Sequence, residues 1–310
     1  DGLLPLADRL EECRKGGLVS QLFGGVGTMD ALGDRQQELL ENFSKRLGLR
    51  VARTAWHSAR DRIAEFLNCL AMLTGSLAKI ANEISQLAKN ETGELEEPFH
   101  MGKIGSTTMP HKRNPELCEQ VVVLGRLVKS AAGLGLDGLI NEHERDYRAV
   151  RLEWVSLVDA SLYSCGALDL LKNILKGLIV HPDRISRNLD TAACLISTEA
   201  LMFLIGDKIG KQAAHQLLYE MSMEAHTSDT QLSRLLSRYP LINTSFTETE
   251  IKEAINPATH IGSAVEQADR VVIMADKWLS ANQATNKQPA PCPLANNTHG
   301  CKANQPGDNP

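Results

Sequence analysis

The sequence predicts an all-α fold built around a bundle of long helices. The main observation is a run of apolar residues whose spacing alternates between three and four positions. Its members are Ile63, Phe66, Leu70, Leu73, Leu77, Ile80, Ile84 and Leu87. Such a seam, sustained over roughly four heptads, is typical of a long helix that packs against near-parallel neighbours. The second observation is that no segment shows the two-residue alternation of a half-buried strand.

The other helices are expected in order along the chain. Gly93 and Pro98 end the seam helix, and Pro115 fits the first turn of the next helix because its missing N–H costs nothing there. Later in the chain, the segment GLIVHPDRISRNLD interrupts the helical pattern, and shorter helices follow it. The expected helices span residues 3–16, 33–47, 63–87, 116–134, 143–175, 192–209, 211–225, 231–236, 248–254 and 261–279.

Three parts of the chain differ in composition and pattern. Residues 1–176 are expected to form a central long-helix bundle domain, and residues 177–280 a smaller C-terminal helical domain. Residues 281–310 are rich in Asn, Gln, Pro, Gly and Ala, so they bury too little apolar surface to offset their ordering entropy. We expect them to be a disordered tail. Because Asp1 stands inside an apolar pattern, we also expect the chain to be part of a longer protein.

Composition and charge exclude several classes of partner. With 43% hydrophobic residues and a net charge of −5, the chain lacks the basic surface that nucleic acids and anionic membranes require. No apolar run reaches the ~18 residues of a membrane span. The seven cysteines are odd in number and include no CxxC pair, which favours reduced thiols in a cytoplasmic protein. Neither a nucleic acid nor a membrane is an expected partner.

The segment GSTTMPHKRNPE differs from the helical sequence around it. Ser106 and Thr107 supply hydroxyl and N–H groups, Lys112 a positive charge and Asn114 an amide. With the unpaired N–H groups of the helix that follows, these residues suit a carboxylate or an oxyanion that develops during a reaction. A serine among such donors can also act as a general base. A solvated loop before an N-capped helix explains the same residues about equally well.

The residues GSTTMPHKRNP resemble the signature of the fumarase/aspartase superfamily, which has the form GSxxMPxKxNP. The stretches FGGVGT, WHSARDRIAEF, HERDYRAVRLEW and ISRNLD make the chain look most like the branch of 3-carboxy-cis,cis-muconate cycloisomerase and adenylosuccinate lyase. The resemblance covers roughly residues 1–280. It implies a homotetramer built on a twenty-helix bundle, in which each active site is assembled from three subunits.

The resemblance also implies roles for individual residues. Ser106 corresponds to the catalytic serine that removes a proton next to a carboxylate. Lys112 and Asn114 correspond to residues that hold this carboxylate and stabilise the carbanion, with Thr107 beside them in the substrate-binding loop. The implied enzyme is a lyase or cycloisomerase that acts on a polycarboxylate. It needs no metal and no organic cofactor, because the substrate's own carboxylate takes up the charge.

Other functions remain open. An adenylosuccinate lyase-like enzyme that breaks a C–N bond and releases fumarate is one alternative. HERDYRAVRLEW lacks the serine and arginine spacing those enzymes use for the nucleotide phosphate, which favours a smaller substrate. The family's N-terminal threonine–histidine segment has no counterpart here, so we expect these residues alone to be inactive. A non-catalytic helical scaffold is the alternative of another class.

Three arginines follow the signature segment on the expected helix 143–175. Arg145, Arg148 and Arg151 are spaced three apart, so they are expected to share one helix face. One interpretation is that they pair with substrate carboxylates, with Arg145 the best candidate. Acidic neighbours make a salt-bridged surface the simpler alternative. His57 either reaches the substrate or has a structural role at a helix start.

Overall fold

The computed structural model describes residues 2–99, 109, 113–228 and 232–285. Within these ranges the regular structure is helical apart from two two-residue strands, which confirms the predicted all-α fold. The helices are α1 (Leu4–Gly17), α2 (Gln36–Leu47), α3 (Asp61–Leu87), α4 (Glu116–Asp137), α5 (Tyr147–Lys176), α6 (Pro182–Ile196), α7 (Thr198–Ile209), α8 (Lys211–Ser228), α9 (Leu232–Leu236), α10 (Pro240–Ser245), α11 (Glu248–Ile255) and α12 (Ala264–Thr285). Two short 3₁₀ turns lie at Asp30–Leu32 and Pro257–Thr259, and the strands are β1 (Leu95–Glu96) and β2 (Ile179–Val180).

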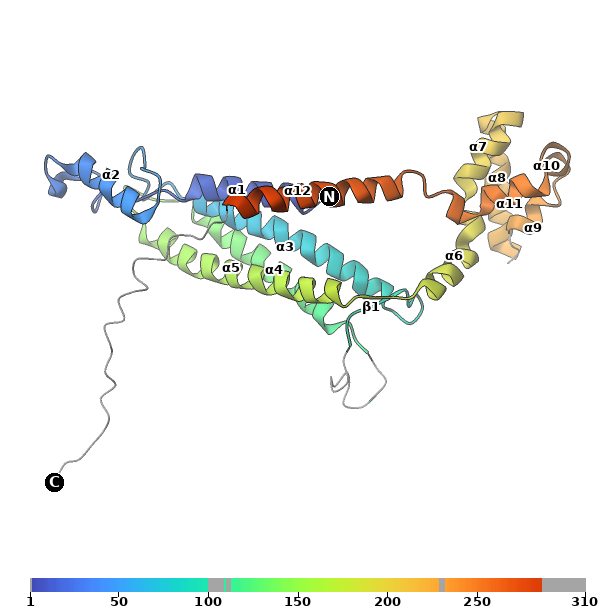
Figure 1. The fold of residues 1–310 in the computed structure, drawn as a ribbon, viewed down its shortest axis with the longest axis horizontal. Coiled ribbons are helices and arrows are strands. Elements are labelled where there is room, and N and C mark those ends of the chain that lie inside the picture. Colours follow the sequence, from blue (N-terminus) through green and yellow to red (C-terminus); the bar gives the residue numbers. More distant parts are fainter. Residues whose placement is uncertain (1, 100–108, 110–112, 229–231, 286–310) are drawn as a thin grey trace, which may run out of the picture. The chain divides into compact units, whose positions relative to one another are not determined.

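Helices α3, α4 and α5 form a bundle in which neighbours run in alternating directions (Figure 1). None of the residues of the predicted seam of α3 is exposed. The most deeply buried residues of α3 also include Leu67, Thr74 and Ala81, which have no accessible surface. This wider buried face arises because α3 packs against α1, α4 and α5 at the same time.

Two glycines of α4 allow this helix to lie very close to α3. A Cβ atom at Gly125 would stand 3.0 Å from the carbonyl oxygen of Thr74 and 3.1 Å from the Cβ of Ala78. At Gly135 it would stand 2.3 Å from the Cδ1 of Leu67. Glycine is a poor helix former, so Gly125 in the interior of α4 requires an explanation. Its presence is explained by helix packing.

Helix α3 is apolar enough to resemble a membrane span. It has 27 residues, and an 18-residue window reaches a mean hydropathy of 1.3. The sequence analysis did not identify this window as long and apolar enough to span a membrane. A core helix of a soluble protein has the same length and composition. Leu67, Leu77 and Ile84 are buried in the bundle clusters, and 39% of the window is buried, so part of this apolar surface belongs to the bundle core.

Several element boundaries differ from the sequence prediction. The helix expected to begin at residue 143 begins at Tyr147, because the Asp146 side chain accepts a hydrogen bond from the Arg148 N–H at 2.9 Å and caps the helix. The interruption expected in GLIVHPDRISRNLD is short, since α6 begins at Pro182, a residue compatible with the first turn of a helix.

The helix expected at 192–209 is divided between α6 and α7. The division falls at Ser197, whose buried hydroxyl donates to the Ile255 carbonyl at 3.1 Å. The two strands were also missed. They pair antiparallel, Leu95 with Val180 and Glu96 with Ile179, and are too short to show an alternating pattern.

The chain forms two compact units, residues 1–257 and 258–310. In the first unit, α7, α8, α9, α10 and α11 surround a separate core that includes Leu201, Ile205 and Leu236. In the second unit, α12 extends to Thr285, beyond the expected end at 279. The predicted domain boundary at residue 177 stays a prediction, and residues 286–310 of the expected tail lie outside the described residues.

The close approach of α3 and α4 gives a first prediction. Gly125→Val places a branched side chain against the Thr74 carbonyl, so the free energy of unfolding should fall by about 1–3 kcal/mol. Gly133→Ala is the matched control, because nothing lies within 4 Å of its added Cβ. It should leave stability unchanged or raise it by up to ~1 kcal/mol. Chemical denaturation followed by circular dichroism measures both, and equal effects would contradict the packing explanation.

Candidate active site

The last three residues of the signature segment, Arg113, Asn114 and Pro115, line a cleft of about 900 Å³ at the start of α4. Ser106, Thr107 and Lys112 lie outside the described residues, so their predicted roles stay predictions. Asn114 is half-buried and lies in the wall of the cleft, two residues before α4 begins. Other described residues of the wall include Glu96, Glu97, Phe99, His181 and Arg184.

A buried carboxylate occupies the N-terminus of α4. Glu97 is 5% exposed, and its Oε2 accepts hydrogen bonds from the backbone N–H of Leu117 at 3.0 Å and of Cys118 at 3.2 Å. Pro115, at the N-cap position, contributes no side-chain cap. The expectation that these amides are open to a substrate carboxylate is therefore wrong, because a protein carboxylate already binds them.

Glu96, directly before Glu97, makes a second contact between the two ends of the signature segment. Glu96 accepts a hydrogen bond from the Arg113 guanidinium at 2.6 Å, and Arg113 also stacks on the Phe99 ring, 4.6 Å from its centre. The other oxygen of Glu96 lies 3.5 Å from the Nε2 of His181, just before α6. The segments that enter and leave the signature are thus joined by adjacent glutamates.

The other predicted site residue, Arg145, lies at the opposite end of the bundle. It precedes α5, so it does not share a helix face with Arg148 and Arg151, contrary to the sequence expectation. Asn114 precedes α4, whereas Arg145 follows the connection from the end of α4 to α5. A helix of 22 residues such as α4 is about 33 Å long at a rise of 1.5 Å per residue. One chain therefore does not bring Asn114 and Arg145 to the same small substrate.

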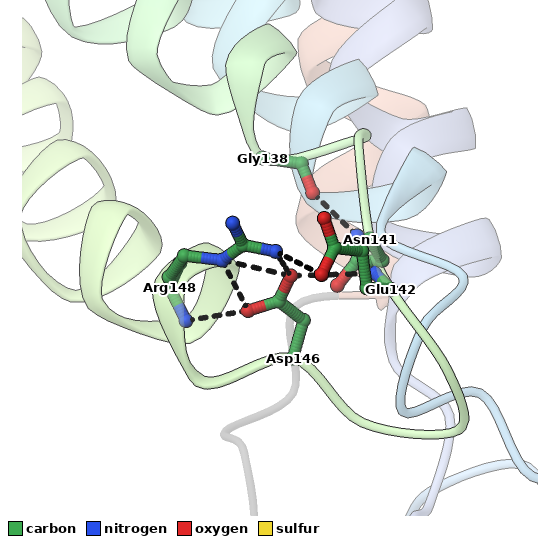
Figure 2. Close-up of polar contacts among 5 residues, drawn as sticks. All are labelled: Gly138, Asn141, Glu142, Asp146 and Arg148. Carbon is green, nitrogen blue, oxygen red and sulfur yellow. Dashed lines mark hydrogen bonds and ion pairs between the residues drawn. The ribbon is translucent and has the colours of Figure 1, made fainter.

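Figure 2 shows why Arg148 belongs to the structure of the α5 N-terminus. Its guanidinium contacts both oxygens of Asp146, the closest at 2.6 Å, and lies 3.0 Å from Glu142. Asp146 also accepts a hydrogen bond from the Glu142 N–H. The hydrogen bonds from Arg148 hold the pKa of the Asp146 carboxyl well below its ordinary value, and the same contacts raise the pKa of Arg148. The salt-bridge alternative holds for Arg148.

Arg145 differs from its two neighbours in the contacts it makes. Arg151 stacks on the rings of Tyr147 and Trp154 and donates a hydrogen bond to the Tyr147 hydroxyl. Arg145 is exposed, and within the described part of the chain it makes no ion pair with a carboxylate. Of the three arginines, Arg145 is the one whose guanidinium is available to bind a ligand.

His57 lies near Arg145 at this end of the bundle. Burial lowers the pKa of its imidazole below the ordinary 6.5, and the positive charges of Arg145 and Arg60 lower it further. The imidazole is therefore neutral at pH 7. Its Nδ1 atom is buried and has no hydrogen-bond partner among the described residues, as is also true of the Arg62 Nη1 and Asn141 Oδ1 atoms. Such atoms are uncommon in folded proteins.

A buried ion pair holds the backbone at His57. Arg60, just before α3, contacts both carboxylate oxygens of Glu153 on α5, one of them at 2.5 Å. The Arg60 side chain is 11% exposed and that of Glu153 is 6% exposed. Arg60 also stacks on the Trp56 ring and donates to the carbonyl oxygens of Trp56 and His57. Sequence reasoning missed Glu97 and Glu153, because their partners are distant in the chain.

Comparisons with known proteins agree with the resemblance of the signature segment. A family described as Lyase matches residues 6–128, and one described as Adenylosuccinate lyase C-terminus matches residues 194–271. The chain is 38% identical over 268 residues to N-acetyl-S-(2-succino)cysteine lyase of Dickeya dadantii, covering 86% of this chain and 59% of the relative. It is 30% identical to 3-carboxy-cis,cis-muconate cycloisomerase of Acinetobacter baylyi, covering 86% and 59%.

Solved structures resemble the fold as well. The crystal structure of 3-carboxy-cis,cis-muconate lactonizing enzyme from Pseudomonas putida superimposes with a TM-score of 0.80 at 30% identity, covering 90% of this chain and 61% of that one. The chain spans less than two thirds of the length of these three proteins.

The position of His57 gives a second prediction. Arg145→Ala removes one of the positive charges that disfavour protonation, so the His57 pKa should rise toward 6.5. An NMR pH titration of the imidazole signals measures the change, and Arg151→Ala is the control that should leave the His57 pKa where it is. An unchanged pKa in Arg145→Ala would contradict the proximity of the two side chains.

The same shift has a consequence for stability. The folded state binds the His57 proton less readily than the unfolded state, so this residue lowers stability as pH falls from 6.5 through the folded pKa. Well above pH 6.5 it has no effect.

Proposed function

Because this chain belongs to the fumarase/aspartase superfamily, we propose that the full-length protein is a cofactor-free lyase that acts on a small polycarboxylate. The observation that carries the proposal is the segment GSTTMPHKRNP, which ends with Asn114 and Pro115 in the wall of the cleft at the start of α4. The segment contains a hydroxyl base, a cation and amide donors within a few residues, as this chemistry requires.

In the proposed reaction, Ser106 removes a proton from the carbon next to a substrate carboxylate. Lys112 and Asn114, with Thr107, bind this carboxylate and stabilise the negative charge that spreads onto its oxygens. The bond from the adjacent carbon to the leaving group then breaks, and the leaving group departs with the electron pair. A carbon–carbon double bond forms between the two carbons. The substrate's own carboxylate takes up the charge, so the proposal includes no metal or organic cofactor.

We place a succinate substituted through sulfur first among substrates. The support is the 38% identity to a protein named N-acetyl-S-(2-succino)cysteine lyase, which exceeds the 30% identity to the cycloisomerase. Elimination from such a compound breaks a carbon–sulfur bond and leaves fumarate and a thiol. The cycloisomerase reaction, which relates 3-carboxymuconate to its lactone, is the second candidate, supported by the structural similarity to the P. putida enzyme. Adenylosuccinate, with a carbon–nitrogen bond to break, is the third.

We assign a second carboxylate of the substrate to the end of the bundle that carries Arg145. The support is its lack of a carboxylate partner within the described residues, together with the buried Nδ1 of His57 and Nη1 of Arg62, which are unpaired there. A neutral imidazole and two guanidinium groups provide hydrogen bonds and charge for a carboxylate. This assignment requires the Arg145 end of one subunit to meet the signature segment of another.

A homotetramer satisfies that requirement. An antiparallel copy of the bundle brings opposite ends together, which one chain cannot do. The outer face of α5 supports such packing, because Trp154, Val158 and Leu162 recur at every fourth position and are 56%, 54% and 65% exposed. A stripe of exposed large apolar residues is typical of a surface that another subunit covers. We also propose a cytoplasmic location, supported by Cys13 and Cys69, which remain thiols in the described part of the chain.

The third prediction tests the reaction. Full-length protein should convert at least one of N-acetyl-S-(2-succino)cysteine, 3-carboxymuconate or its lactone, adenylosuccinate and argininosuccinate, as followed by alkene absorbance. Ser106→Ala should lower kcat by about 10²–10⁴-fold, because the general base is lost. Ser130→Ala, an exposed serine on α4, is the control and should retain full activity. A stable oligomer that converts none of these compounds would favour the non-catalytic scaffold.

The fourth prediction tests the shared site. Ser106→Ala and Arg145→Ala proteins should each be inactive, and joint refolding should restore activity. If the two residues of a site come from different subunits, about one quarter of the sites in a random equal mixture combine two unaltered residues. Native mass spectrometry confirms that mixed oligomers formed. Mixed oligomers without recovered activity would show that Ser106 and Arg145 do not act in one site across subunits.

A further inference from the structure

The contacts of Glu97 go beyond what a surface carboxylate would make. It is nearly fully buried, lies 20 residues before Leu117 in the chain, and binds two amides in the first turn of α4. The N-cap position offers no side-chain cap, since Pro115 stands there. We infer that Glu97 is a positioning residue that fixes the start of α4 and thereby sets the place of Asn114 in the active site. The inference rests on the proposed function, in which Asn114 binds the substrate carboxylate.

The position of Asn114 depends on how the first turn of α4 is held. Glu97 is the acceptor that the described side chains provide for the amides of Leu117 and Cys118, and the first turn of a helix frays readily without such a cap. Asn114 lies three residues before Leu117, so fraying there displaces its side chain. A displacement near 1 Å at a positioning residue can lower a rate by about 10²-fold.

The charge of Glu97 has a second effect on substrate binding. A helix N-terminus attracts anions through its amides and its partial positive charge. Glu97 occupies these amides, so the substrate carboxylate binds side chains of the signature segment and does not bind the helix end. Removal of the Glu97 carboxylate would open a competing position for a small anion at the start of α4.

Glu96 fixes the other residue next to Asn114. Its ion pair with Arg113 joins β1 to the residue directly before Asn114. Glu97, directly after Glu96, joins the same stretch of chain to Leu117 in the first turn of α4. Asn114 is therefore held from both sides by two adjacent glutamates. Glu97 is the better residue to test, because it is buried, whereas the Arg113 side chain is 54% exposed and an exposed ion pair contributes little.

The test compares three variants of the full-length protein with the wild type. Glu97→Ala removes both acceptor oxygens, Glu97→Gln keeps one acceptor in the same place, and Gln120→Ala removes an exposed polar side chain of α4 that does not line the cleft. Steady-state kinetics gives kcat and KM per folded molecule, with the folded fraction taken from circular dichroism. Hydrogen exchange read by mass spectrometry reports on the amides at the start of α4, and assays are repeated with added formate.

We expect Glu97→Ala to lower kcat/KM by about 10–100-fold with a raised KM. Exchange at the start of α4 becomes faster, formate restores part of the activity by binding the vacated amides, and Glu97→Gln lies between Glu97→Ala and the wild type. Gln120→Ala matches the wild type. If Glu97→Ala does not fold, the kcat and KM of the isosteric Glu97→Gln decide in its place.

Two results overturn the inference. One is a folded Glu97→Ala protein with the kcat and KM of the wild type. The other is an activity per total protein that falls only in proportion to the folded fraction, with an unchanged KM and no effect of formate, which is the behaviour of a purely structural residue. A wild-type protein without activity on any substrate overturns the proposed function instead, and the exchange data then still show whether Glu97 caps α4.

Discussion

The close packing of α3 against α4 is the constraint on which the rest of the structure depends. Gly125 and Gly135 let the two backbones approach until the next heavy atom is the Thr74 carbonyl or the Leu67 side chain. Helices that fit this closely have little freedom to slide or rotate against each other. Since α3, α4 and α5 alternate in direction, the packing also fixes which connections meet at each end of the bundle (Figure 1). The polar residues of the candidate site therefore lie at these two ends, with Asn114 at one and Arg145 at the other.

At each end of the bundle, a buried carboxylate binds a partner that is distant from it in the chain. Glu97 binds the amides of α4, and Glu153 of α5 binds Arg60 just before α3. A buried charge without a partner is strongly unfavourable, so each contact holds its two segments in one arrangement. Arg60 in turn donates to the carbonyl of His57. In the proposed site, the residues assigned to the substrate are therefore positioned by residues that do not touch it.

The sequence predicted the long helices well because their signal is local. The seam between Ile63 and Leu87 repeats within a few residues, and burial confirms it. The signature segment likewise identified the family from contiguous residues. The capping role of Glu97 and the ion pair of Glu153 were not predictable, since their partners lie 20 and 93 positions away. The position of Arg145 outside α5 was not predicted, because the helix starts only after Asp146, whose side chain caps it.

The short pairing of β1 with β2 has a consequence for the directions of Glu96 and Glu97. In an extended chain, successive side chains point to opposite sides, so Glu96 and Glu97 diverge toward Arg113 and α4. A slip of one residue in the pairing of β1 with β2 would exchange the directions of the two carboxylates. A slip of two residues would preserve them. The register of two paired residues therefore decides which carboxylate faces Arg113 and which faces α4.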